Sequence, residues 1–208
     1  MTPEGDQFLV NPIGYHWSEL SASDLVLADK DRRILEGENS VEDSAFFIHS
    51  RIHLGNSQAR CVLHTHMPYA TALCLLKKGR LQMASQNALR FYGRIAYIDD
   101  YCGLALDNSE GDRLAQTMGT CTVAFLGAHG VIVTGPSVPE AFDDLYYLEK
   151  ACQAQIIALS SGQELREIPE SMVKQVAPSM QMGLAHLRKL HFKAIQRILD
   201  REEPTYAR

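Results

Sequence analysis

An almost wholly apolar run at residues 121–126, Cys-Thr-Val-Ala-Phe-Leu, constrains the fold most strongly. A strand that is apolar at consecutive positions is expected to be covered on both of its faces. Such a strand lies inside a sheet that has helices packed on either side. The run therefore predicts an α/β protein with three layers, in the order helix, sheet, helix.

The rest of the chain alternates between strand-like and helix-like segments, without a low-complexity linker or an internal repeat. Besides the apolar run, strands are predicted at residues 8–10, 25–27, 60–66, 95–98 and 131–133. Helices are predicted at residues 44–55, 67–78, 109–118 and 138–160, and from Pro169 onward. Ser137 and Glu140 have the spacing of a capping box at the start of the longest helix. We expect one α/β domain at residues 1–162 and a C-terminal helical extension at residues 163–208.

The composition excludes several classes of function. The formal net charge is −5 and most basic residues are scattered, so no nucleic-acid partner is expected. The five cysteines include no Cys-x-x-Cys pair, which favours reduced thiols over a disulfide framework. The first six residues are polar, and no apolar stretch approaches the roughly 18 residues that span a bilayer. We therefore expect a cytoplasmic protein with no membrane partner.

Three histidines stand where their side chains can converge. His64 and His66 are two residues apart at the end of a predicted strand, so both point to the same face. His129 ends the apolar run and lies between Gly127 and Gly130, which permit a tight turn. If the two strands are neighbours, three imidazoles face one point. Three protein ligands with one open position are typical of a catalytic zinc site.

Other interpretations of the histidines stay open. A single His-x-His pair arises often by chance in a chain with eight histidines. His49 and His53 are four residues apart on a predicted helix and could chelate an ion, but a packed helix face is the more common arrangement. His186 and His191 fall in the polar C-terminal segment and are expected at the surface.

Several ordered motifs resemble the class II aldolase/adducin family. The resemblance covers roughly residues 7–161 and rests on Phe8-Leu9-Val10-Asn11-Pro12-x-Gly14, Cys61-Val62-Leu63-His64-Thr65-His66, Ala128-His129-Gly130 and Leu148-Glu149-Lys150-Ala151-Cys152-Gln153-x-Gln155. It implies a central, mostly antiparallel sheet flanked by helices. It also implies one zinc ion, or another divalent metal, per chain at His64, His66 and His129. A homotetramer with the active site at a subunit boundary is a further implication.

The resemblance is incomplete around the expected reaction centre. Ala45 stands at the position of the family's catalytic glutamate, and Glu42 and Asp43 are out of register with it. Ser44 matches one of the paired serines that hold substrate phosphate, whereas Asp43 occupies the other place. The family's tyrosine acid and its N-terminal phosphate-binding loop have no clear counterpart. The catalytic residues therefore stay unknown, and the nearest candidates are Tyr97, Asp99, Asp100 and Tyr101.

Two functions follow from the resemblance. The first is a zinc-dependent aldolase-like lyase or epimerase, acting on a small hydroxy-carbonyl compound such as a sugar or sugar phosphate, with Ser44 in the substrate site. The second is a non-catalytic, oligomerising module that retains the metal site. Motifs such as Ser85-Gln86-Asn87-Ala88-Leu89 and Ala96-Tyr97-x-Asp99 resemble the adducin head domain and favour that branch.

Overall fold

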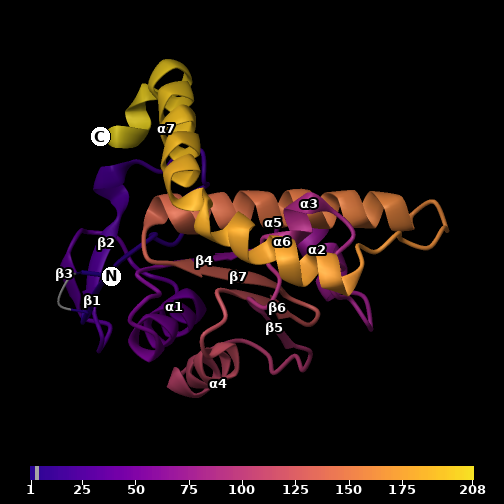
Figure 1. Cartoon of the computed structure of the whole chain (residues 1–208). Coiled ribbons are helices and arrows are strands. Elements are labelled where there is room, and N and C mark those ends of the chain that lie inside the picture. Colours follow the sequence, from indigo (N-terminus) through magenta and orange to yellow (C-terminus); the bar gives the residue numbers. More distant parts are fainter. Residues whose placement is uncertain (3–4) are drawn as a thin grey trace.

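The computed structural model describes residues 1–2 and 5–208, so Pro3 and Glu4 of the polar N-terminus lie outside the described residues. Its centre is a four-stranded sheet in the order β4 (Cys61–Thr65), β7 (Gly130–Gly135), β6 (Val123–Leu126) and β5 (Ile95–Ile98) (Figure 1). The pairs β4–β7 and β7–β6 are antiparallel, and only β6–β5 is parallel. The expected mostly antiparallel sheet is confirmed.

Helices cover both faces of this sheet. On one face lie α1 (Asp43–Gly55) and α4 (Asn108–Met118), and on the other lie α2 (Pro68–Cys74), α3 (Gln86–Leu89) and α5 (Val138–Leu159) (Figure 1). The apolar run explains why both layers form. Val123 and Phe125 join the core beneath α2 and α5, whereas Ala124 and Leu126 join the core beneath α1 and α4. The predicted three-layer α/β fold is therefore confirmed.

A second, smaller sheet lies beside α1. It consists of β1 (Gln7–Val10), β2 (Val26–Asp29) and β3 (Ile34–Glu36), all antiparallel, with the short 3-10 helix η1 (Ala22–Asp24) before β2. Phe8 and Val26 point inward with Phe46 of α1 and form a separate small core. This sheet thus holds the N-terminal segment against the helix that begins at the candidate site.

Two local predictions were wrong. Helix α2 ends at Cys74 rather than at residue 78, because the chain folds back over its last turn. A Cβ at Gly79 would lie 1.8 Å from the Leu73 carbonyl oxygen, so glycine is needed for this close approach. At the start of α5, Ser137 does not cap the backbone, because its hydroxyl donates to the Glu140 carboxylate at 3.1 Å.

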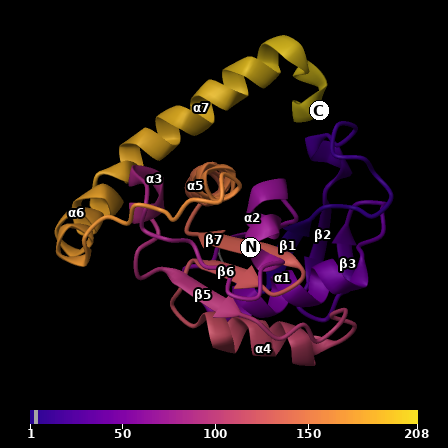
Figure 2. The same cartoon turned by 90° about the vertical axis from the view of Figure 1, so that its right-hand side faces the viewer.

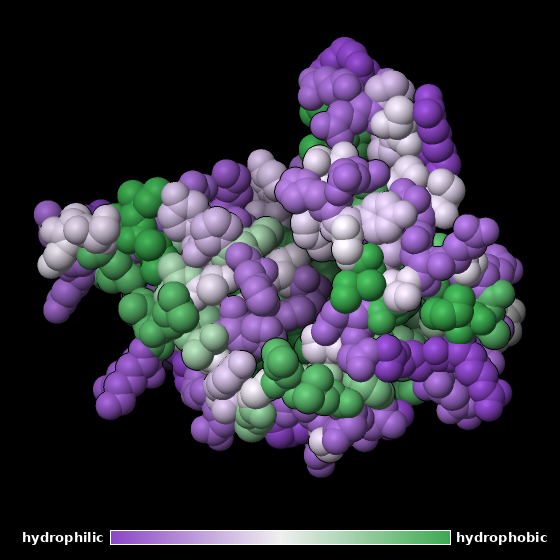
Figure 3. Space-filling view, turned by 180° about the vertical axis from the view of Figure 1, so that it is seen from behind, coloured by the Kyte–Doolittle hydropathy of each residue, from purple (hydrophilic) through white to green (hydrophobic). Residues whose placement is uncertain are grey.

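The C-terminal part of the chain forms α6 (Glu170–Met182), α7 (Leu184–Glu202) and the 3-10 helix η2 (Pro204–Ala207). Helix α7 rises away from the sheet layers, and its surface is mostly hydrophilic when seen from behind (Figures 1, 2 and 3). The chain end returns to the N-terminal segment, where the Ser23 N–H donates to the Arg208 carbonyl at 2.7 Å. Arg188 is the buried residue of α7.

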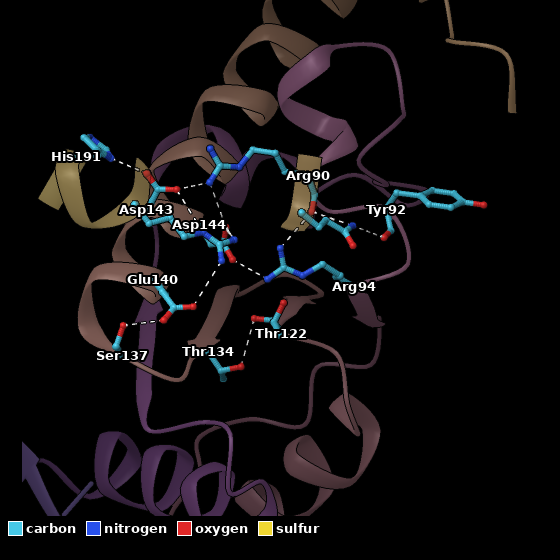
Figure 4. Close-up of polar contacts among 12 residues, drawn as sticks. Arg90, Tyr92, Arg94, Thr122, Thr134, Ser137, Glu140, Asp143, Asp144 and His191 are labelled. Carbon is cyan, nitrogen blue, oxygen red and sulfur yellow. Dashed lines mark hydrogen bonds and ion pairs between the residues drawn. The ribbon is translucent and has the colours of Figure 1, made fainter. Parts of the chain in front are cut away.

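Ion pairs attach α7 to the domain (Figure 4), together with the packing of two rings of α7 on Phe142 of α5. Arg188 of α7 donates to Asp144 of α5 at 2.6 Å, and Arg94 reaches the same carboxylate at 2.6 Å. Arg90 pairs with the neighbouring Asp143. His191 also contacts Asp143, with its Nδ1 2.7 Å from the carboxylate, and is half-buried. The expectation that His191 is a surface residue was therefore wrong.

Over residues 1–2 and 5–208, the helices are all too short or too polar to cross a membrane. The five cysteines are free thiols, as the sequence predicts.

Asp144→Asn should destabilise the protein strongly. It removes a buried carboxylate that faces Arg94 and Arg188, and it leaves their charges without an equivalent partner. Losing one partner of a buried ion pair costs about 3–5 kcal/mol of unfolding free energy. Urea denaturation would measure the loss, and Glu170→Gln, which removes an exposed carboxylate from α6, serves as the control. Equal urea midpoints for the two variants would contradict the importance of the ion pairs.

Acid should destabilise the protein through His53 of α1. Its ring stacks on Phe8 with centroids 5.2 Å apart, and its Nδ1–H donates to the Ala59 carbonyl. Burial lowers the pKa of His53 from 6.5 to about 4. Between these values only the unfolded chain binds the proton, so the contribution is complete above about pH 6.5 and is lost as the pH falls towards 4.

We expect His53 to lower the free energy of unfolding by up to about 1.4 kcal/mol per pH unit over this range. Urea denaturation at a series of pH values would measure the slope. His53→Gln should flatten the slope, whereas His186→Gln, at an exposed position of α7, should not. A slope that His53→Gln leaves unchanged would refute this assignment.

Candidate metal centre

The histidine cluster forms where β4 and β7 pair. His64 lies opposite Ile132 in the antiparallel register, and Thr65 lies opposite Val131. His66 follows directly after β4, and His129 lies in the turn that joins β6 to β7. Because the end of β4 is adjacent to the start of β7, the His-x-His pair meets the turn that carries His129. The two strands of the prediction are not direct neighbours, since β7 lies between β4 and β6, but the turn after β6 still brings His129 to the pair.

The three rings face one another closely. Their centroids are 5.1 Å apart for His64 and His66, 4.7 Å for His64 and His129, and 4.8 Å for His66 and His129. One ring nitrogen from each lies within 4.8 Å of the other two. A tetrahedral zinc ion with bonds of about 2.0–2.1 Å holds its nitrogens roughly 3.4 Å apart. Small side-chain rotations would bring these three donors to one ion.

Hydrogen bonding orients His64 within the cluster. Its Nδ1 lies 3.1 Å from the Val131 carbonyl oxygen, so Nδ1–H donates to the backbone and Nε2 keeps its lone pair. Burial, followed by the nearby His129, lowers the pKa of His64 to about 4. Burial and the adjacent His66 also lower the pKa of His129. Both rings are therefore neutral near pH 7, which is the form that binds a metal.

The two glycines of the 127–130 turn are needed for space rather than for a left-handed backbone conformation. The left-handed residue is Ala128, with φ of 55°, rather than either glycine. Gly130 is required by space, since a Cβ there would lie 2.6 Å from the Cδ2 atom of His66. A Cβ at Gly127 would lie 2.2 Å from the Asp99 carbonyl oxygen. The two glycines thus permit close approach of neighbouring segments, and this approach brings His129 to His66.

The cluster opens onto a cavity of about 650 Å³. The N-terminus of α1, the end of β4, the 103–105 segment and α4 form its walls. His66 is the exposed member of the cluster, so the open side lies there. The lining residues include Trp17, Glu42, Ser44, Ala45, Ile48, Met67, Leu104, Glu110 and Leu114. A small molecule in this cavity would contact the histidines directly.

The structure shows which of the candidate catalytic and substrate-binding residues lie at the cavity. Ser44 and Ala45 both line the cavity, although Ala45 contributes no ionisable group. Tyr97 packs on Phe125 in the opposite core, and Asp99 pairs with Arg80.

Tyr101 lies nearer the cluster, with its ring 6.3 Å from that of His129. Asp100 lies beside it, in a small neighbouring depression rather than in the cavity. His49 and His53 remain outside the cluster, as the preferred interpretation of α1 predicts.

Sequence reasoning missed two carboxylates in the cavity. Glu42 caps the N-terminus of α1, which is an unusual role for glutamate and explains why spacing alone did not reveal it. Glu110 lies in the first turn of α4 and is held by the Arg113 guanidinium at 2.8 and 2.7 Å. The i,i+3 spacing of Glu110 and Arg113 was visible in the sequence, but its position beside His129 was not.

Residues 1–156 match the family of class II aldolase and adducin N-terminal domains. The chain belongs to this family. It is 36% identical to an aldolase II superfamily protein from Pseudomonas syringae, whose crystal structure aligns with a TM-score of 0.88 over 96% of this chain and 80% of that chain. Class II aldolases typically depend on a divalent metal, and the histidine cluster offers donors for one.

Two other relatives represent the two branches of the family. Beta-adducin of Homo sapiens is 32% identical over 96% of this chain, which corresponds to 29% of its own length. An L-fuculose 1-phosphate aldolase from Glaciozyma antarctica is 25% identical, with a TM-score of 0.81 over 98% of this chain and 78% of that chain.

His64→Ala should abolish tight metal binding, because it removes the most enclosed donor of the cluster. We expect untagged wild-type protein to bind about one zinc ion per chain after reloading and dialysis, and the variant less than about one tenth. Elemental analysis by mass spectrometry would measure both. His186→Ala removes an exposed histidine from α7 and should bind as much zinc as the wild type. Full zinc content in His64→Ala would show that the ligands are misassigned.

Proposed function

We propose that His64, His66 and His129 hold one divalent metal ion per chain, and that the protein is a class II aldolase-type lyase. Its substrate would be a small hydroxy-carbonyl compound. The supporting observation is the convergence of three imidazoles on one open cavity. Zinc fits this donor set best, because it favours nitrogen ligands, and three of them leave a position for substrate.

The cavity offers groups for each part of such a reaction. A bound zinc ion would polarise the carbonyl and hydroxyl oxygens of the substrate and stabilise the negative charge that develops when a C–C bond breaks. We assign proton transfer to Glu110, the carboxylate that lines the cavity together with His129. Its two hydrogen bonds from Arg113 fix its orientation. If Glu110 instead removed the C–H proton beside the carbonyl and returned it to the other face of that carbon, the reaction would be an epimerisation.

A second function is favoured by Ala45 and by the similarity to beta-adducin. Ala45 places a methyl group in the cavity where the sequence comparison within the family expects a catalytic glutamate. In this alternative the chain is a non-catalytic module that oligomerises and keeps the metal site. Turnover distinguishes the two functions, because both are expected of an oligomer.

Glu110→Gln should slow catalysis and spare metal binding. Zinc-loaded protein would be incubated with phosphorylated and free ketoses and hydroxy acids, and the cleavage products would be followed by proton NMR. Losing a general acid–base group lowers kcat by about 10²–10⁴-fold. Asp112→Asn is the matched control, since Asp112 lies in the same helix but pairs with Arg51 away from the cavity.

The result also decides between the two functions. Wild-type activity in Glu110→Gln would remove this residue from the mechanism without affecting the proposed metal site. Full zinc content with no product from any compound, together with a discrete oligomer in sedimentation, would support the adducin-like module instead.

A further inference from the structure

The N-terminus of α1 lines the cavity, and the carboxylate of Glu42 is already bound to it. The Oε2 atom of Glu42 accepts the Ala45 N–H at 2.7 Å and the Ser44 hydroxyl at 2.7 Å. Burial alone would raise the pKa of Glu42, but these hydrogen bonds outweigh it and the pKa lies below its usual value. A helix N-terminus is a ready site for phosphate, because its first N–H groups lack helical partners. Here a carboxylate of the chain itself takes that place.

Ser44 cannot serve as the expected phosphate donor in this arrangement. A serine hydroxyl has one hydrogen, and Ser44 gives it to Glu42. Its remaining lone pairs would face the lone pairs of a phosphate oxygen. The residue that matches the family's phosphate-binding serine is therefore committed to the helix cap.

The cavity also lacks a free cation. Among the described residues that line it, none is Lys or Arg. The guanidinium of Arg113 lies behind the wall and donates twice to Glu110. Arg32, near the start of α1, pairs with Asp43, which does not line the cavity. Apart from the proposed metal ion, a phosphate group would thus meet two carboxylates and, among the described lining residues, no lysine or arginine side chain.

Apolar side chains form the opposite part of the wall. Trp17 is 73% exposed and Leu104 is 69% exposed, and both line the cavity with Ile48, Met67 and Leu114. Large apolar side chains that converge around an open cavity provide a binding surface for an apolar ligand group.

We propose that Glu42 is a specificity-determining residue that occupies the anion site of this cavity, so that the substrate is an unphosphorylated hydroxy-carbonyl compound with an apolar substituent. The proposal rests on the proposed metal-dependent function, and it adds the class of substrate. It sets this chain apart from a relative whose name specifies a sugar phosphate, the L-fuculose 1-phosphate aldolase.

Three hydroxamates that share one metal-binding group test the proposal by calorimetry on the zinc-loaded protein. They are glycolohydroxamate, its phosphate ester, and 3-phenyllactohydroxamate, which carries an apolar ring. We expect the phenyl compound to bind at least about tenfold more tightly than glycolohydroxamate, and the phosphate ester at least about tenfold more weakly. Tightest binding of the phosphate ester would overturn the proposal, and equal binding of the phenyl and parent compounds would overturn its apolar part.

Glu42→Ser tests the residue itself. Serine keeps a helix cap while removing the charge, so the fold should persist. We expect the variant to bind the phosphate ester at least about tenfold more tightly than the wild type does, with little change for glycolohydroxamate. Glu38→Ser is the matched control, because it makes the same replacement at an exposed position that does not line the cavity. Glu42→Gln, which preserves shape, provides the same test if Glu42→Ser does not fold.

The outcomes distinguish this proposal from the proposed function. A gain in Glu38→Ser equal to that in Glu42→Ser, or no gain in either Glu42 variant, would refute the role of Glu42 and leave the metal site intact. Failure of glycolohydroxamate to bind the zinc-loaded wild type would refute the metal-dependent function, and the inference with it.

Discussion

The pairing of β4 with β7 is the interaction on which the candidate site depends. Its register sets Thr65 opposite Val131, so the His-x-His segment leaves the sheet beside the turn that carries His129. The same pairing supplies the Val131 carbonyl that orients His64. A slip by one residue would turn His64 to the opposite face of the sheet. Core packing resists such a slip, because it would also move Val62 out of the core beneath α1 and α4.

The family motif at residues 148–155 of α5 supports the pairing of β4 with β7. Leu148 and Cys152 are buried in the core, while two polar side chains of the same helix bind backbone. Glu149 accepts the Tyr69 and Ala70 N–H groups at the start of α2, just after His66. Gln155 accepts the Gln82 N–H and donates to the Arg80 carbonyl. Through these hydrogen bonds, the family motif in α5 fixes the segment that follows the candidate metal ligands.

The two ends of the domain are stabilised in different ways. Around the cavity, carboxylates are tied to local donors, as Glu42 is to Ala45 and Ser44, and their charge faces the ligand. On the far side, Asp143 and Asp144 are buried and paired with arginines from three different segments. This second arrangement helps to attach α7 to the domain. Charged groups thus line the candidate site at one end of the domain and hold the helical extension at the other.

The sequence by itself determined the strands other than β3, most helices and the three histidines. These depend on local periodicity: a doubly buried strand is apolar at every position, and residues two apart in a strand share a face. Family motifs added the mostly antiparallel order of the sheet.

Only the tertiary structure decided that Glu42 caps the end of α1 at the cavity, that Glu110 lies beside His129 and that His191 contacts Asp143. These positions depend on segments far apart in the chain or on a cap of unusual residue type, and neither leaves a periodic pattern. The candidate site was therefore predictable in its three histidines, whereas its carboxylates depend on how the helices pack around them.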